Sequence, residues 1–400
     1  MGASTSVIPS ASQSLGASGK LSASTQSGRA SQNFAAVVGV FMRAYENGDI
    51  NVPEIKAAIE GLSVALDKDP KLKSAVDLSF IAKLKDWKKG NEHLFPHVQL
   101  AVYCAKEVYD LRTKQAIDDR KAKQPPGSQS KLVEGAPAEL LKGDPASYLQ
   151  NTKNWALFKD AKSNNLYFSV RGTSTTGFAA VIDNLTNADA DAKLTIEFDT
   201  GTQNQGKFKA HRGFLEVAEA MFPTTKAAVL NAAKGLTPKP TLVFCGHSAG
   251  GGTAFFLYHF FQMRTTQAER DTFQAVHCMT FGSAAIASIP NPVHSKRTDD
   301  RILSFINVND PVPRAELPYA DWLAETLGRY LAIRQGNTNV PPYSALPNQI
   351  LYPGGEMVLL DEGGEVAGKL EPGTLSGKAF LDLAAHNSLG YKNIVSQLLK

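Results

Sequence analysis

A short apolar strand that passes through a glycine-rich turn into a helix constrains the fold of this chain more than any other feature. The predicted strand covers residues 240–245, the turn covers 246–250 and the helix covers 254–264. The alternation continues on both sides, with predicted strands over 155–160, 166–172, 194–200, 275–282 and 301–308, and a helix over 214–236. Strands that alternate with helices favour a mostly parallel sheet covered by helices on both faces. The predicted fold class is therefore α/β.

The turn itself reads Gly246-His247-Ser248-Ala249-Gly250. A serine in this position is typical of the nucleophile elbow of the α/β-hydrolase fold, where a strained strand-to-helix turn lifts the hydroxyl clear of the sheet. Glycines flank it because side chains there would collide with neighbouring backbone. The amide of Ala249 and the helix N-terminus lie where an oxyanion would form. The alternative is a purely structural glycine-rich turn whose serine has no catalytic role. The context favours Ser248 as a nucleophile.

In α/β-hydrolases the catalytic base follows the nucleophile and the acid along the chain. Four histidines follow Ser248. His259 falls on the helix that leads away from the turn, His277 lies inside a predicted strand, and His294 precedes the expected acid. His386, near the C-terminus, is therefore the predicted base.

The predicted acid is Asp310, which comes directly after the strand over 301–308. Chemistry in an open α/β sheet belongs at the carboxyl ends of its strands. The rival is Asp382, which lies one helical turn before His386 and would orient it locally. The order of the chain favours Asp310.

Several segments together resemble the motifs of the class 3 lipase family, which includes fungal triacylglycerol lipases and plant plastid phospholipases A1. YFSVRGT resembles the FRG[ST] motif, HRGF at 211–214 resembles HxGF, and GHSAGG resembles GHSLGG. TFGS at 280–283 resembles TFGSPRVG, NVNDPVPR resembles NxxDxVP, and His386 followed by Tyr391 resembles HxxxxY. The resemblance covers roughly residues 94–400.

The resemblance implies further site residues. Thr173 would supply an oxyanion hydroxyl and amide, and Ala249 the second amide. Residues 174–187 fall where the family carries its lid, and their apolar spacing is that of a short amphipathic helix. The apolar lid residues include Phe178, Val181, Ile182 and Leu185.

The chain also departs from the family pattern. Ala249 replaces the usual leucine, and Ala284 and Ala285 replace a proline and an arginine. Residues 319–349 have the character of an insertion. These differences bear on the choice of substrate more than on the chemistry.

The sequence thus predicts acyl transfer from a lipid ester to Ser248, followed by hydrolysis by water, without a metal or an organic cofactor. The same three residues could pass the acyl group to an alcohol, which would make the protein a lipid acyltransferase. A third reading is a non-catalytic, lipase-like signalling or lipid-binding protein. A bacterial effector is compatible with the enzyme reading, since it concerns delivery.

The N-terminal part of the chain differs in composition from the rest. Residues 1–33 are rich in Ser, Ala and Gly, so they are expected to be disordered. Residues 34–93 form a predicted helical extension, with helices over 33–48 and 52–69, and the lipase-like domain is expected over 94–400. A helix is predicted over 95–111, and residues 111–150 are expected to be a linker with little regular structure.

The tail also fits several cellular addresses. Gly2 and Ser6 satisfy the N-myristoylation pattern. A Ser-rich stretch without acidic residues also resembles organellar transit peptides and the leaders of bacterial type III effectors, and it lacks the apolar core of a secretory signal. The expected location is cytoplasmic, or a host cell reached without a signal peptide, with peripheral membrane contact.

Composition narrows the function further. The net charge of +4 is too weak to indicate a nucleic-acid partner. No run of 18 apolar residues predicts a transmembrane helix. Cys104, Cys245 and Cys278 are widely spaced, which argues against a zinc site or a disulfide framework and suits a reducing compartment.

Overall fold

The computed structural model describes residues 52–111, 113–123, 137–147, 151–172, 195–199, 207–289, 297–361, 367–371 and 373–399. Within these ranges the strands form a nine-stranded sheet in the order β1-β11-β10-β9-β8-β7-β4-β3-β2 and a separate β5–β6 pair. The strands are β1 (Lys85–Asp86), β2 (Ala138–Asp144), β3 (Trp155–Asp160), β4 (Leu166–Val170), β5 (Thr195–Asp199), β6 (Lys207–His211), β7 (Leu242–His247), β8 (Val276–Phe281), β9 (Arg301–Asn307), β10 (Glu356–Leu360) and β11 (Ala367–Leu370).

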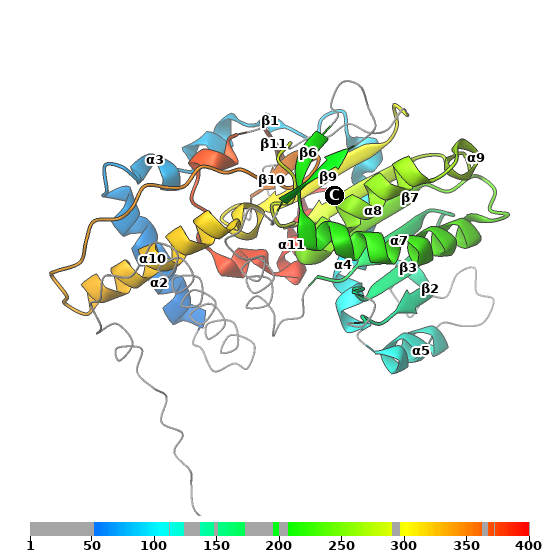
Figure 1. Ribbon diagram of the computed structural model, residues 1–400, viewed down its shortest axis with the longest axis horizontal. Coiled ribbons are helices and arrows are strands. Elements are labelled where there is room, and N and C mark those ends of the chain that lie inside the picture. Colours follow the sequence, from blue (N-terminus) through cyan, green and yellow to red (C-terminus); the bar gives the residue numbers. More distant parts are fainter. Residues whose placement is uncertain are drawn as a thin grey trace, which may run out of the picture.

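The centre of the large sheet is parallel. Strands β4, β7, β8, β9 and β10 run in the same direction, whereas the outer strands on both sides pair antiparallel. The predicted α/β-hydrolase fold is confirmed by this sheet and the helices around it (Figure 1).

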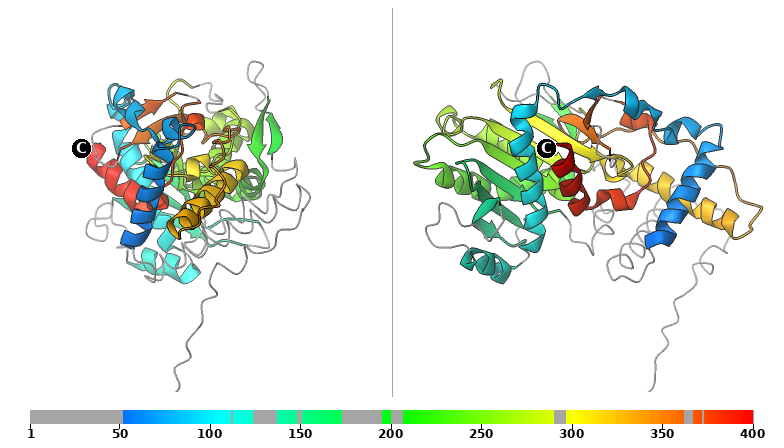
Figure 2. Two further views of the ribbon diagram at one scale, coloured as in Figure 1. Left: turned by 90° about the vertical axis from the view of Figure 1, so that its left-hand side faces the viewer. Right: turned by 180° about the vertical axis from the view of Figure 1, so that it is seen from behind.

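Helices cover both faces of the sheet (Figure 2). On one face lie α7 (Arg212–Ala233) and α8 (Ala249–Arg264), which share a core with the sheet. On the other face lie α4 (Phe95–Glu107) and α11 (Ser388–Leu398), in a second core. Each core therefore lies between the sheet and one helical layer, and the carboxyl ends of the parallel strands stay available for a site.

Helix α8 is the most deeply buried of these elements. All residues from Ala249 to Phe261 are buried, so the helix shows no polar face, as expected for a helix enclosed by a core. Each fully buried phenylalanine on it contributes about 1.5–3 kcal/mol through the removal of apolar surface from water. Ser248, which directly precedes its first residue, thus stands next to a firmly anchored element.

Two further helices, α2 (Val52–Asp67) and α10 (Leu317–Arg334), contact each other at one end of the molecule (Figure 1). A Cβ at Gly61 of α2 would overlap the Tyr330 hydroxyl of α10. Strand β1 also pairs with β11, so the segment before residue 94 adds a strand to the sheet. The remaining short helices are α3 (Lys73–Val76), α5 (Lys114–Ala122), α9 (Gln267–Arg270), η2 (Ser79–Lys83), η3 (Glu92–Leu94), η4 (Val108–Asp110), η6 (Val312–Arg314), η7 (Leu375–Gly377) and η8 (Leu383–His386).

The prediction of a linker with little regular structure over 111–150 is wrong for two segments. Helix α5 begins after Thr113, whose side chain accepts a hydrogen bond from the Ala116 amide. Strand β2 pairs with β3 at the edge of the sheet. Helix α5 buries only Ile117, and β2 carries a register shift between Leu140 and Lys142, so neither gives a clear apolar period.

The helix expected over 33–48 lies outside the described residues. The strand expected over 194–200 is present as β5, but it pairs with β6 rather than joining the large sheet. Each of the three cysteines is buried. Among the helices that the structure describes, none has both the length and the apolar character needed to span a bilayer.

Candidate active site

Ser248 lies between the end of β7 and the first residue of α8. Its backbone has a φ of 59° and a ψ of −134°, which a residue with a side chain rarely adopts. Such a conformation costs on the order of 1–3 kcal/mol and persists only where the surroundings enforce it. The Ser248 amide donates to the Phe281 carbonyl oxygen over 3.0 Å, which ties the turn to strand β8. The predicted elbow geometry is therefore present.

Glycines make this turn possible. A Cβ at Gly246 would lie 2.5 Å from the backbone carbon and oxygen of Gly250. A Cβ at Gly250 would lie 2.7 Å from the backbone nitrogen of Gly172, just beyond strand β4. Each contact is far shorter than a real Cβ contact, so strand, turn and helix approach this closely only without side chains.

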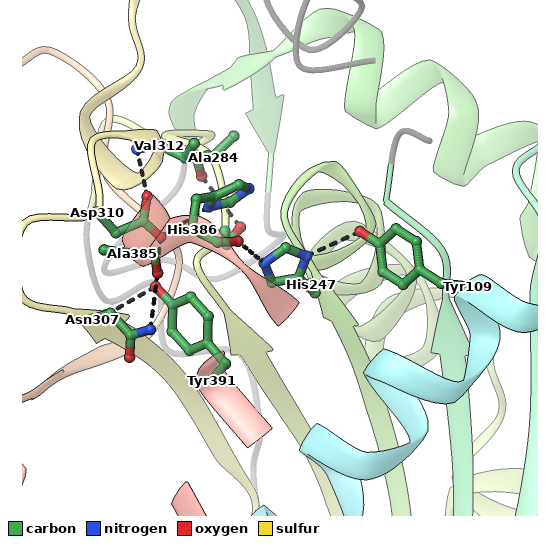
Figure 3. A network of polar contacts seen from close by, with 10 residues as sticks. Tyr109, His247, Ala284, Asn307, Asp310, Val312, Ala385, His386 and Tyr391 are labelled. Carbon is green, nitrogen blue, oxygen red and sulfur yellow. Dashed lines mark hydrogen bonds and ion pairs between the residues drawn. The ribbon is translucent and has the colours of Figure 1, made fainter. Parts of the chain in front are cut away.

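Asp310 lies beyond the end of β9 and is completely buried. Its Oδ1 accepts a hydrogen bond from the Val312 amide over 2.9 Å. Its Oδ2 lies 2.9 Å from Nδ1 of His386 and accepts from the Tyr391 hydroxyl over 2.6 Å (Figure 3). The structure thus brings the predicted acid and the predicted base into direct contact.

Tyr391 reaches this carboxylate from helix α11. Burial, followed by the nearby Asp310 carboxylate, raises the pKa of Tyr391 well above its usual range, so its hydroxyl stays protonated and donates. The same oxygen accepts from the Asn307 amide over 2.9 Å. Gly282 completes the surroundings, because a Cβ there would lie 2.7 Å from Oδ2 of Asp310.

The partner of Nδ1 determines how the His386 ring is oriented. A carboxylate only accepts hydrogen bonds, so Nδ1 of His386 carries the hydrogen toward Asp310. In the neutral ring, Nε2 is then the basic nitrogen. This is the tautomer that a general base needs in a serine triad.

The predicted base also contacts the elbow. Nε2 of His247 lies 2.8 Å from the backbone oxygen of His386, and the two rings are 4.5 Å apart between centroids. Because His247 immediately precedes Ser248, this contact places the backbone of the predicted base beside the predicted nucleophile. The arrangement combines an elbow serine, a histidine and a buried carboxylate, which is the set of groups that serine acyl transfer requires.

The remaining candidates occupy other positions. His259 is fully buried with its ring 4.3 Å from that of Phe255, as expected for a packing residue. His277 lies within β8, and Nδ1 of its ring accepts from the Arg301 amide over 3.2 Å. His294 lies outside the described residues. The rival acid Asp382 donates its backbone amide to the Asn309 oxygen, whereas the hydrogen bond to the imidazole comes from Asp310.

Part of the predicted oxyanion and lid region also lies outside the described residues. Thr173 and residues 174–187, with Phe178, Val181, Ile182 and Leu185, belong to this group. Ala249 is described and is buried as the first residue of α8. The described residues include no cluster of three or more His, Cys, Asp or Glu side chains that could hold a metal ion.

The family model described as lipase (class 3) matches residues 167–320. Over residues 167–320, called the class 3 lipase segment below, the chain is therefore similar to class 3 lipases. This class 3 lipase segment runs from β4 into α10 and holds Ser248 and Asp310, while His386 and Tyr391 follow it. This match supports a carboxylic ester hydrolase with a serine nucleophile, as expected from the motifs.

Among solved structures, the chain is similar to a Rhizomucor miehei lipase propeptide complex, with 14% identity, a TM-score of 0.46 and coverage of 78% of this chain and 83% of that one. It is also similar to a triacylglycerol lipase from Penicillium expansum, with 15% identity, a TM-score of 0.45 and coverage of 73% and 91%. A lipase from Rhizopus microsporus var. chinensis gives 13% identity, a TM-score of 0.40 and coverage of 76% and 88%. No curated protein matches the chain.

Two residues beside the site were missed by sequence reasoning. Gly282 belongs to the TFGS motif, but nothing in the sequence shows that its missing side chain makes room for Asp310. Tyr109 lies before the class 3 lipase segment, and its hydroxyl is 3.0 Å from Nδ1 of His247. No local signal points to it, because the contact joins residues 138 positions apart in the chain.

Proposed function

We propose that the protein is a lipase-type serine ester hydrolase with Ser248, His386 and Asp310 as its catalytic triad. The observation that carries this proposal is the hydrogen bond between Asp310 and the ring of His386. The backbone carbonyl of His386 is in turn held by His247, the residue before Ser248. The class 3 lipase match over 167–320 supports it independently of that geometry.

In the proposed reaction, Oγ of Ser248 attacks the carbonyl carbon of an ester while Nε2 of His386 takes the hydroxyl proton. The tetrahedral intermediate then expels the alcohol, which receives that proton, and an acyl-serine ester is left. Water attacks this ester by the same route and releases the free acid. Asp310 keeps the ring in the required tautomer and stabilises the imidazolium.

The developing oxyanion needs donors on the other side of the carbonyl. We assign this role to the amide of Ala249, at the N-terminus of α8, and to Thr173, as the family resemblance implies. Each such donor is worth about 3–4 kcal/mol in the transition state. The aligned peptide dipoles of α8 favour negative charge at the same place.

The proposed substrate is an acyl ester of a lipid. The class 3 lipase match supports this class, and one of the solved structures that the chain resembles is named as a triacylglycerol lipase. Within this class we propose a phospholipase A1-type activity as the finer alternative, because a glycerophospholipid presents the same carboxylic ester. We further propose that residues 1–33 act in delivery, as a leader would, and take no part in the chemistry.

Covalent labelling tests the nucleophile. A fluorophosphonate probe should modify Ser248 in the wild-type protein and leave Ser248→Ala unlabelled, as measured by mass spectrometry of the labelled peptide. Asn and Ala variants at His386 should slow the labelling while the protein stays folded. Equal labelling of Ser248→Ala would place the nucleophile elsewhere. Product analysis with an added alcohol distinguishes hydrolysis from acyl transfer. Ester products in place of free acid would show that the protein is an acyltransferase.

The proposed lid gives a second test. From the family resemblance we propose that residues 174–187 act as this lid. An apolar segment that covers a nucleophile opens favourably where a lipid phase replaces its contacts, which shifts the population toward the open form. Hydrolysis of a lipid ester should therefore rise steeply once the substrate aggregates, and Phe178→Asp should blunt that rise. Phe178→Leu is the matched control and should retain it. An equal loss on a short soluble ester would show that Phe178 supports the fold instead.

A further inference from the structure

A chain of hydrogen bonds runs from helix η4 through the elbow to the base. The Tyr109 hydroxyl is 3.0 Å from Nδ1 of His247, and Nε2 of His247 is 2.8 Å from the backbone oxygen of His386. Figure 3 shows His247 between Tyr109 on one side and His386 on the other. The triad chemistry proposed above uses neither Tyr109 nor His247.

The direction of this chain follows from the chemistry of its ends. The His386 oxygen is a carbonyl and only accepts, so Nε2 of His247 carries a hydrogen. Burial, followed by the neighbouring His386, holds the pKa of His247 well below its usual range, so the ring is neutral and Nδ1 accepts. Burial raises the pKa of Tyr109, which keeps its hydroxyl protonated as the donor.

The same tyrosine also touches the end of strand β4. A Cβ at Gly172 would overlap the Tyr109 hydroxyl and would lie 2.7 Å from the His247 carbonyl oxygen and 3.2 Å from the Ser248 Cβ. The ring of Tyr109 also lies 5.6 Å from the Arg171 guanidinium. Tyr109 therefore contacts both the segment after strand β4 and the elbow. Through His247 it is also connected to the backbone of His386.

We propose that Tyr109 and His247 are positioning residues that fix the backbone of His386 relative to Ser248. This inference rests on the proposed function and adds to it. Asp310 sets the orientation of the His386 ring, whereas His247 holds the main chain at the end of the short helix η8. A displacement of about 1 Å between reacting groups can lower a rate by about 100-fold, so this attachment bears on turnover.

Three variants separate the parts of the network. Tyr109→Phe removes only the hydroxyl, and His247→Leu removes the donor to His386. His247→Gln keeps an amide N–H near the position of Nε2. We expect kcat for a soluble ester to fall about 10-fold for Tyr109→Phe and about 100-fold for His247→Leu, with KM nearly unchanged, since the effect is on geometry in the transition state. His247→Gln should recover most of the loss.

A matched control exists between strand β4 and helix α4. The Tyr167 hydroxyl is 3.0 Å from Nδ1 of His97 in α4, so it makes the same kind of bond away from the proposed triad. Tyr167→Phe and Tyr109→Phe should each lower the melting temperature slightly and by similar amounts, because each loses one hydrogen bond. Only Tyr109→Phe should lower kcat. Equal kcat values for wild type, Tyr109→Phe and His247→Leu would overturn the positioning role, as would an equal loss in Tyr167→Phe.

Two measurements keep this inference separate from the function on which it rests. Fluorophosphonate labelling of the wild-type protein tests the nucleophile itself, and its failure would count against the proposed function. Nitrogen NMR of the imidazoles tests the network without turnover: His247 should be neutral with its hydrogen on Nε2, and Tyr109→Phe should shift the His386 signals. A charged His247, or His386 signals that do not respond, would refute the network even in an active enzyme.

Discussion

The two halves of the proposed triad are held by different physical means. The elbow around Ser248 is held by shape, because glycines on three segments let backbones approach to distances that no side chain would allow. The corner around Asp310 is held by hydrogen bonds, which come from Val312, Tyr391 and His386. A change at an elbow glycine should therefore act mainly on the fold, and a change at the corner mainly on turnover.

The largest effect is expected at the corner. Asp310→Asn keeps the size of the side chain but reverses the donor and acceptor pattern that sets the His386 tautomer. We expect kcat to fall on the order of 10⁴-fold, as in serine proteases whose triad aspartate is replaced in this way, with little change in melting temperature. Ester hydrolysis and thermal unfolding measure the two quantities. Asp382→Asn is the control, and a collapse of activity in that variant instead would contradict the assignment.

The elbow should respond in the opposite way. In Gly246→Ala the new methyl group would lie 2.5 Å from the Gly250 backbone, which no side-chain rotation can relieve. We expect a loss of about 3 kcal/mol in the free energy of unfolding, since overpacking forces backbone shifts. Gly328→Ala is the control: nothing lies within 4 Å of that position on α10, and the change should stabilise the helix by about 0.5–1 kcal/mol. If both variants unfold alike, steric crowding does not hold the elbow.

The same contrast explains how much the sequence could predict. The elbow is contiguous in the chain, so Gly246, Ser248 and Gly250 carry a readable pattern. The pairing of Asp310 with His386 could be inferred only indirectly, from the strand before Asp310, the order of the chain and the motif resemblance, because 76 residues separate the two. Tyr109 could not be found, since its bond to His247 joins an element outside the class 3 lipase segment.

The fold shows a similar limit. Buried parallel strands such as β7 and β8 are largely continuous apolar runs, so they can be recognised directly in the sequence. Helix α5 and edge strand β2 were missed because partly exposed elements with charged residues give a weak apolar pattern. The pairing of β5 with β6 could not be predicted either, since the alternation of apolar and polar residues predicts a strand but not its partner.

The smallest effect is expected at a third position, beside helix α7. His211 is buried, its ring is 4.6 Å from that of Phe214, and neither ring nitrogen has a hydrogen-bond partner among the described residues. Burial lowers the pKa of His211 to about 4, from 6.5 in the unfolded chain. Close packing holds this side chain in place, as it holds the elbow. The ring lacks hydrogen bonds of the kind that hold Asp310.

This lowered pKa gives a defined pH dependence. Above pH 6.5 the ring is neutral in both states, so its burial carries no protonation cost. Between pH 6.5 and about 4 the unfolded chain binds a proton that the folded protein does not, so stability falls by about 1.4 kcal/mol per pH unit. His211→Phe should remove this part of the slope, since phenylalanine buries the same area without a titrating group. By urea unfolding, the variant should match the wild type at pH 7 and exceed it by about 2 kcal/mol at pH 5. Parallel losses in wild type and His211→Phe would show that other groups cause the acid sensitivity, and that His211 finds a partner when it is protonated.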